Sequence, residues 1–494
     1  MEFETILRGG RVYDGSGGRA REVDLGLGAG RILAMGDLSE VQAPRVLELQ
    51  GAWVLPGFVD VHTHYDLCLD WPELSDHCLR QGITSVIGGN CGLGEADTGA
   101  VLEHAQRAQL GVHFGVLAPL GPLRSRVVPR AEGRAASPAE RQRLAAEVEA
   151  ALSAGALGVS WGPYHANALM DSAEIEAALG PAARVGRPWC VHRRREGIGG
   201  LEATQEALEL ARAAGVPLQI SHLKAAGKLS WASLEPVLEC IDAARREQDL
   251  SVDVYPYDAS LTYLSAMIPD SLKSDGGLAG VLADPTRRPE AGRGVEGWFE
   301  RRMGPEAIVL LEPALPEVPR GSTLAEAADA LGTDPVEAAL RLIAAEANTT
   351  GGWAIYREMM DPEQVEAVLD LPYAAVASDA VPEEAGDAIS AHPRAFASFT
   401  RALARAQRIG EARLADAVRQ ATRLPAERFG LSARGRIEEG AVADLVVLSS
   451  LEEGASYRDP CVYPRGVDYV FVAGQVALAE GEPTGTRAGA LLRP

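Results

Sequence analysis

The chain has 494 residues, with 47 lysines and arginines against 69 aspartates and glutamates, and a formal net charge of −22. This acidic balance argues against nucleic acid or an anionic membrane as partner, because both are bound through basic patches. No apolar run reaches the roughly 20 residues that span a bilayer, and the first residues lack the apolar stretch of a signal peptide. The six cysteines have no framework spacing, so we expect a reducing, cytoplasmic setting.

Both ends of the chain are predicted to be rich in β-strands. Near the start, short apolar runs alternate with Gly9-Gly10 and Asp14-Gly15, which are typical hairpin turns. A second strand-rich block closes the chain. The predicted domains are a small β-sandwich built from residues 1–55 and 426–494, and a central domain over residues 56–425.

The central domain alternates apolar runs with amphipathic helical segments. Short continuous apolar strands between helices indicate a parallel sheet that is buried on both faces. Eight such runs predict a (β/α)8 barrel. The runs are Val54–Val61, Thr84–Gly88, Val112–Ala118, Ala156–Ser160, Pro188–Val191, Pro217–Ser221, Ser251–Tyr255 and Tyr373–Ala377.

One connection is far longer than the others. Residues 263–350 separate the seventh run from the eighth and are rich in Pro, Gly and charge near their middle. Long insertions after a barrel strand emerge at the catalytic face and often form lids. A solvated decoration of the barrel is the alternative, and the sequence leaves both open.

Histidines follow several of the predicted strands. His62 and His64 are two residues apart at the end of the first run, so their side chains point to the same face. This pair alone is a weak metal signal. His192 and His222 end the fifth and sixth runs, so four of the nine histidines of the chain are expected at one mouth of the barrel.

A carboxylate and a thiol follow two other strands. Asp379 comes after the eighth run, where a carboxylate can bind a metal or exchange a proton with water, but it could equally cap a helix. Cys91 could be a small buried apolar residue or a metal ligand. Its glycine-rich surroundings, Gly88-Gly89-Asn90-Cys91-Gly92, favour an exposed tip.

Several motifs together resemble the amidohydrolase superfamily and, within it, the D-aminoacylase or N-acyl-D-amino-acid deacylase group. The resemblance covers nearly the whole chain. The two most telling segments are 56–64, which resembles the opening strand of the superfamily, and 89–92, whose cysteine replaces the carboxylated lysine of other members. Consistent with that, the fourth run contains no lysine. Other matching segments are 192–197, 220–224, 253–257, 392–394, 435–440 and 443–446.

The resemblance implies a zinc centre and a set of roles. In the implied assignment, the main zinc is held by Cys91, His192 and His222, and a second, weaker site is formed by His62 and His64 with Cys91 as the bridge. Asp379 would contact the metal centre and act as general base and then as general acid.

The resemblance also implies four residues that bind substrate. Lys224, Tyr255 and Arg394 match positions that hold the substrate carboxylate or polarise the scissile carbonyl, and Tyr164 matches less closely. Surface charge or a core aromatic position is the alternative for each. The loop Ser378-Asp379-Ala380 departs from the usual Ser-Asp-Gly, and the loops after the third and fourth runs also differ. These departures concern the substrate pocket, because barrel loops set specificity.

The implied reaction is zinc-dependent hydrolysis of N-acyl-D-amino acids, a small-molecule substrate class. Another amidohydrolase reaction, on a cyclic amide, a dipeptide or an N-carbamoyl compound, is the close alternative. A metal-free scaffold on the same barrel is the alternative from another class. The basic run Arg193–Arg195 could favour acidic substrates or could be solvated.

Overall fold

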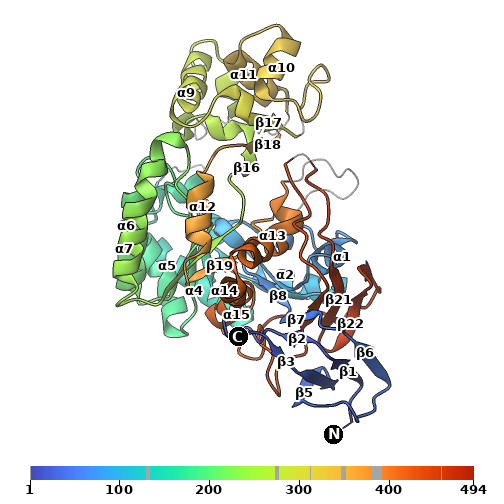
Figure 1. Cartoon of the computed structure of the whole chain (residues 1–494). Coiled ribbons are helices and arrows are strands. Elements are labelled where there is room, and N and C mark those ends of the chain that lie inside the picture. Colours follow the sequence, from blue (N-terminus) through green and yellow to red (C-terminus); the bar gives the residue numbers. More distant parts are fainter. Residues whose placement is uncertain are drawn as a thin grey trace.

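The computed structural model describes residues 2–128, 134–163, 165–272, 278–311, 313–346, 352–380, 392–457 and 459–493. Figure 1 shows three parts: a central barrel, a β-rich part that contains the N-terminus, and a largely helical insertion at the opposite end of the molecule. The C-terminus lies at the barrel, where Leu492 N–H donates to the Phe114 carbonyl at 2.7 Å. Among the described helices, none is long and apolar enough to cross a membrane.

The centre of the described chain is a barrel of eight parallel strands. They are β8 (Phe58–Asp60), β9 (Ile83–Gly88), β10 (His113–Val116) continued by β11 (Ala118–Pro119), β12 (Val159–Trp161), β13 (Trp189–Val191), β14 (Leu218–Ile220), β15 (Leu250–Val254) and β19 (Ala374–Val376). The last strand closes on the first, because Asp379 N–H donates to the His62 carbonyl at 2.9 Å and His64 N–H donates to the Ala380 carbonyl at 2.8 Å. The predicted barrel is confirmed.

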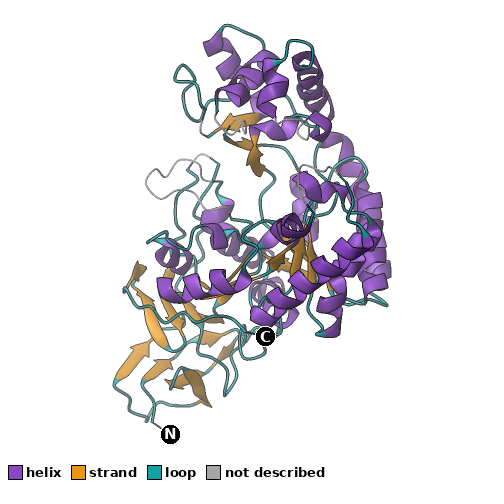
Figure 2. Cartoon of the chain, turned by 180° about the vertical axis from the view of Figure 1, so that it is seen from behind, coloured by secondary structure: helices purple, strands orange, loops and turns teal. Residues whose placement is uncertain are grey.

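Helices surround these strands, as Figure 2 shows from behind. They are α1 (Leu74–Leu79), α2 (Thr98–Ala108), α3 (Leu120–Val127), α4 (Pro138–Ala154), α5 (Ser172–Arg184), α6 (Gly200–Ala214), α7 (Leu234–Ala244), α12 (Pro362–Leu369), α13 (Arg394–Ile409), α14 (Glu411–Ala421) and α15 (Arg423–Arg428). Helix α4 begins where the sequence provides a capping box: the Ser137 side chain accepts from Glu140 N–H, and the Glu140 side chain accepts in return from Ser137 N–H.

The first predicted run is wrong in one respect, because it belongs to two strands. Strand β7 (Trp53–Pro56) pairs with β20 (Leu445–Leu448) in the β-rich part, and only β8 belongs to the barrel. The chain passes from one sheet to the other at Gly57. A Cβ atom at Gly57 would lie 2.2 Å from Thr84 Oγ1, so a larger residue would force the two strands apart.

The β-rich part is built from segments near both ends of the chain. One sheet contains β1 (Thr5–Arg8), β4 (Asp24–Gly28), β5 (Arg31–Gly36) and β6 (Arg45–Glu48). The other contains β2 (Arg11–Val12), β3 (Arg21–Glu22), β7, β20, β21 (Val467–Val472), β22 (Gln475–Ala479) and β23 (Glu482–Pro483). Leu25, Ile32 and Phe471 belong to one buried cluster that both sheets share. The exact domain boundaries stay a prediction.

The long connection between β15 and β19 forms a small α/β unit. Its antiparallel sheet consists of β16 (Ser260–Tyr263), β17 (Ile308–Leu310) and β18 (Trp353–Tyr356), and its helices are α8 (Leu278–Ala283), α9 (Arg288–Arg301), α10 (Leu324–Leu331) and α11 (Pro335–Ala345). Its described part has a core of its own, which includes Leu264, Val295 and Leu342. The unit is therefore more than a surface decoration, while movement as a lid stays a prediction.

Candidate metal centre and active site

The structure brings the predicted ligands together at the carboxyl end of the barrel. They come from five strand ends: His62 and His64 after β8, Cys91 in the turn after β9, His192 after β13, His222 after β14 and Asp379 after β19. Their ligand atoms form three overlapping groups in which every pair of atoms is within 4.8 Å.

Cys91 lies at the centre of this cluster. Its Sγ is 3.4 Å from His62 Nε2, 3.7 Å from His192 Nδ1 and 3.5 Å from His222 Nε2. Around a tetrahedral zinc, with bonds of about 2.3 Å to sulfur and 2.0–2.1 Å to nitrogen, sulfur and nitrogen ligands lie about 3.6 Å apart. The spacing and the chemistry of these donors therefore fit zinc.

Asp379 and His64 extend the cluster on the side of His62. Asp379 Oδ1 lies 3.4 Å from His62 Nε2 and 3.6 Å from His64 Nε2. His62, His64 and Cys91 form one candidate ligand group, and Cys91 also belongs to the group with His192 and His222. This arrangement is compatible with two neighbouring metal positions that share the thiolate.

The turn that holds Cys91 is buried, so its predicted exposure is wrong. Cys91 is only 2% exposed. The neighbouring glycines allow close packing, because a Cβ at Gly89 would lie 2.6 Å from the Leu117 carbonyl oxygen. Ser160 on β12 accepts from Gly92 N–H at 3.0 Å and donates to the Gly89 carbonyl. Strand β12, the fourth strand of the barrel, therefore secures the cysteine turn.

Three of the six candidate ligands have a left-handed backbone. The φ angles are 55° at Cys91, 34° at His222 and 49° at Asp379. Residues with a Cβ adopt this conformation at a cost of order 1 kcal/mol or more, and such residues cluster at functional sites. The shared strain supports a common function for residues from three different strand ends.

The electrostatics of the cluster favour ionised donors. Burial alone would raise the pKa of Cys91, but His62 and His222 outweigh it and hold the pKa of the thiol well below its usual range. Burial likewise acts to raise the pKa of Asp379, yet Arg394 and His62 hold it well below the usual value. A thiolate and a carboxylate are the forms that bind a metal, while the histidines bind it as neutral rings.

Two carboxylates behind the cluster were not assigned a role from the sequence. Asp253 Oδ1 lies 3.1 Å from His62 Nδ1 and accepts from His222 N–H at 2.7 Å. Glu196 lies 2.9 Å from His222 Nδ1 and 3.6 Å from His192 Nε2. Metal-binding histidines usually donate their second ring nitrogen to a carboxylate or carbonyl. Glu196 is four residues after His192, so a search for acids close to each predicted histidine could have found it, whereas Asp253 is distant in sequence from both His62 and His222.

The predicted substrate-binding cations lie beside this cluster. Arg394 donates to Asp379 Oδ2 at 2.6 Å, and its guanidinium lies 4.7 Å from the centre of the Tyr255 ring. The Lys224 ammonium lies 5.9 Å from the same ring. The Tyr255 hydroxyl is buried and has no hydrogen-bond partner among the described residues. Tyr164 lies outside the described residues.

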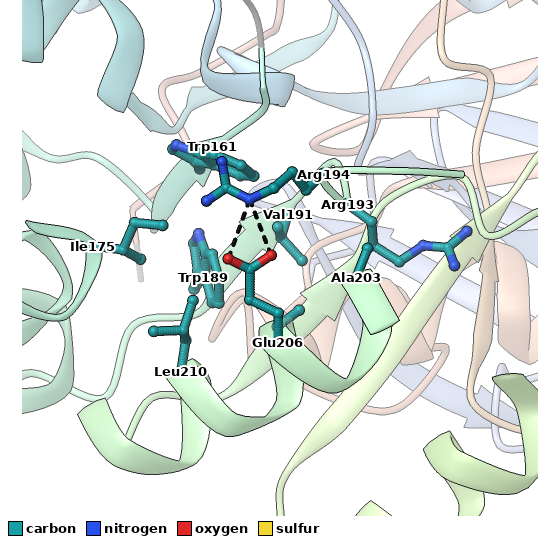
Figure 3. A pocket seen from close by; sticks show the side chains of 10 residues that line it. Trp161, Ile175, Trp189, Val191, Arg193, Arg194, Ala203, Glu206 and Leu210 are labelled. Atoms are coloured by element: carbon teal, nitrogen blue, oxygen red, sulfur yellow. Dashed lines mark hydrogen bonds and ion pairs between the residues drawn. The ribbon is translucent and has the colours of Figure 1, made fainter. Parts of the chain in front are cut away.

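Two of the three arginines in the run Arg193–Arg195 make contacts inside the protein. Arg193 is buried and donates to the Lys224 carbonyl at 2.6 Å. Figure 3 shows Arg194 bound to Glu206 beside Trp161, where they line a cavity of about 10 Å³, close to the smallest space that holds one water molecule. These two arginines therefore have structural partners, and only Arg195 is exposed.

Comparison with known proteins identifies the family of the chain. The model of the amidohydrolase family matches residues 112–478. The N-acyl-D-glutamate deacylase of Alcaligenes xylosoxydans xylosoxydans is 32% identical over 100% of this chain and 97% of its own. A solved structure of D-aminoacylase, described with a binuclear metal centre, one-metal activation and second-metal attenuation, has 29% identity and a TM-score of 0.82. The structure of N-acyl-D-glutamate deacylase from Bordetella bronchiseptica, complexed with zinc and a phosphonate inhibitor, has 29% identity and a TM-score of 0.83. Both structures match over 100% of each chain.

The fold and the site define a metal-dependent hydrolase built on a parallel barrel. The chain belongs to the amidohydrolase family.

Proposed function

We propose that this protein is a zinc-dependent deacylase that hydrolyses the amide bond of N-acyl-D-amino acids and releases a carboxylate and a free D-amino acid. The observation that carries the proposal is a pair of cations, Lys224 and Arg394, which both lie over the ring of Tyr255 next to the metal cluster. Two of the relatives named above are N-acyl-D-glutamate deacylases, and the third is a D-aminoacylase.

The ligand assignment belongs to the same proposal. Cys91, His192 and His222 would hold one tightly bound zinc, and His62 and His64 would form a second, weaker site with Cys91. When bound, zinc supplies a Lewis acid that polarises the carbonyl and lowers the pKa of water toward 7.

Asp379 is the proposed proton carrier. It is ionised, and its Oδ1 faces His62 and His64 while its Oδ2 is held by Arg394. It can therefore accept a proton from the attacking water at Oδ1 without losing its orientation. It then gives the same proton to the departing nitrogen, which leaves as an amine.

Tyr255 and the two cations are the proposed substrate contacts. The unpaired Tyr255 hydroxyl can donate to the oxygen on which negative charge develops. Arg394 has an unpaired Nε in addition to the group that binds Asp379, so it can also contact an α-carboxylate, together with Lys224. A reducing cytoplasm remains our prediction for the location, and its support is that all six cysteines are free thiols.

A substrate screen with added zinc tests the proposal. We expect hydrolysis of N-acetyl-D-amino acids, little hydrolysis of the L-enantiomers, and poor hydrolysis of N-acetyl-D-amino acid amides, which lack the carboxylate. Faster turnover of a hydantoin, a dipeptide or an N-carbamoyl compound would favour the alternative amidohydrolase reactions. Protein with less than one zinc per chain and no activity would favour a scaffold.

A further inference from the structure

One carboxylate contacts two metal-binding histidines from the side that faces away from Cys91. Glu196 Oε1 lies 2.9 Å from His222 Nδ1, and Glu196 Oε2 lies 3.6 Å from His192 Nε2. The opposite ring nitrogens of these histidines, His222 Nε2 and His192 Nδ1, are the ones that face Cys91. Each ring therefore lies between the shared thiol and the shared carboxylate.

A cation and the carboxylate meet at the same nitrogen of His222. Lys224 Nζ lies 2.8 Å from His222 Nδ1 and can only donate, whereas Glu196 Oε1 lies 2.9 Å from both atoms and can only accept. A carboxylate beside a ring nitrogen favours the N–H on that side, which leaves the lone pair toward Cys91, where a metal would be bound, and makes the ring a stronger donor. Glu196 therefore offsets the charge of Lys224 at His222, while its contact with His192 Nε2, at 3.6 Å, is an ion-pair contact without a direct hydrogen bond.

Glu196 also holds a residue of the substrate pocket. The Lys224 ammonium lies 2.9 Å from Glu196 Oε1, and the Lys224 side chain is largely buried. The Glu196 side chain is only 12% exposed, and its backbone carbonyl accepts from Ala226 N–H at 2.7 Å. The loops after β13 and β14 are therefore joined at this residue by both backbone and side chain.

We propose that Glu196 is a positioning residue that orients His192 and His222 for the metal and, through the same carboxylate, places Lys224 for the substrate. The part that concerns Lys224 rests on the proposed function, whereas the part that concerns the histidines does not. Metal loading and carboxylate recognition would in this way depend on one side chain.

Zinc affinity of the purified protein tests the first part without any substrate. Glu196→Gln keeps the shape of the side chain but removes its charge, and we expect zinc affinity, measured by competition with a chromophoric chelator, to fall about 10–100-fold. Glu196→Asp keeps the charge but is one methylene shorter, so it can no longer reach both rings, and we expect a smaller loss. Glu206→Gln is the matched control, because Glu206 pairs with Arg194 away from the metal cluster, and its zinc affinity should equal that of the wild type.

The second part is tested by a double-mutant cycle at saturating zinc. Glu196→Gln should change KM for an N-acetyl-D-amino acid, and this change should disappear in a Lys224→Met background, while the loss of zinc affinity persists. Folded Glu196→Gln and Glu196→Asp proteins with zinc affinity within threefold of the wild type would overturn the metal-positioning role. An equal KM change in both backgrounds would overturn the action through Lys224. If the wild-type enzyme did not hydrolyse N-acyl-D-amino acids, the proposed function would be refuted, but the zinc affinities of the Glu196 variants would still test the metal-positioning role.

Discussion

Removal of a single oxygen atom, in Tyr255→Phe, should separate activity from stability. The Tyr255 side chain is buried, with the guanidinium of Arg394 4.7 Å and the ammonium of Lys224 5.9 Å from the centre of its ring, and phenylalanine retains that ring. No described residue makes a hydrogen bond of ordinary geometry with the hydroxyl, so its removal loses only a weaker contact with the Arg394 guanidinium, which helps to raise the pKa of Arg394.

The expected changes in the free energy of unfolding and in kcat both follow from this buried hydroxyl. A buried polar group without a partner costs about 1–3 kcal/mol, so Tyr255→Phe should leave the free energy of unfolding unchanged or raise it by up to that amount. Loss of one donor to a developing oxyanion lowers kcat by roughly 10²–10³-fold, or about 2.7–4 kcal/mol of transition-state stabilisation. The variant should therefore be slow, fully folded and loaded with zinc.

The assay combines kcat and KM for an N-acetyl-D-amino acid with zinc content and urea unfolding. Tyr257→Phe is the matched control: Tyr257 is close to Tyr255 in the chain, but its hydroxyl donates to the Ala455 carbonyl at 3.4 Å. That variant should lose little activity and up to about 1 kcal/mol of stability. If Tyr255→Phe retained kcat within about threefold of the wild type, or lost activity only in proportion to zinc, the assignment of Tyr255 would be refuted.

Three further predictions concern Asp379, Arg394 and His77. Asp379→Asn should abolish turnover while zinc stays bound, as measured by metal analysis, because the amide cannot carry the proton; near-normal turnover would refute its role. Arg394→Lys should raise KM roughly tenfold for carboxylate substrates but not for their amides, because lysine cannot make a two-point contact; an equal rise for both would contradict carboxylate binding. Burial lowers the pKa of His77 to about 4, so the unfolded chain binds a proton in a pH range where the folded protein does not. As pH falls from about 6.5 to about 4, the wild type should lose about 3 kcal/mol of stability in urea unfolding, and His77→Gln should show a flatter profile; identical profiles would exclude this linkage.

The barrel and its histidines could be predicted because strand ends have a simple geometry. A parallel barrel places the carboxyl ends of all strands at one mouth, so residues that directly follow the apolar runs converge there whatever their separation in sequence. This rule is enough to predict that His62, His192 and His222 meet at one mouth. The split between β7 and β8 falls at Pro56-Gly57, a turn signal that lies inside one apolar run, and the two strands differ in the sheet with which each one pairs.

Environment and partners could not be predicted in the same way. The glycines around Cys91 suggested an exposed turn, since glycine is common in exposed turns, but here they allow the turn to approach Leu117 closely. Asp253 has no local signal for the two histidines that it contacts, and the four-residue spacing from His192 to Glu196 does not indicate the contact with His222. Contacts between side chains on different loops depend on distances in the folded barrel, which the sequence does not show.

The left-handed backbone at three ligands shows how tertiary contacts overrule local preference. Asp379 is held by its N–H, which donates to the His62 carbonyl, and His222 by its N–H, which donates to Asp253 at 2.7 Å. Cys91 is held through its neighbour Asn90, whose side-chain amide donates to backbone carbonyls of Val61, Thr63 and Ile87 at 3.0–3.3 Å. In each case, a contact with a residue distant in sequence stabilises a conformation that the ligand would avoid by itself. The donor groups are therefore brought within ligand distance of one another by the closed barrel itself, which is the preorganisation that a metal-dependent hydrolase requires.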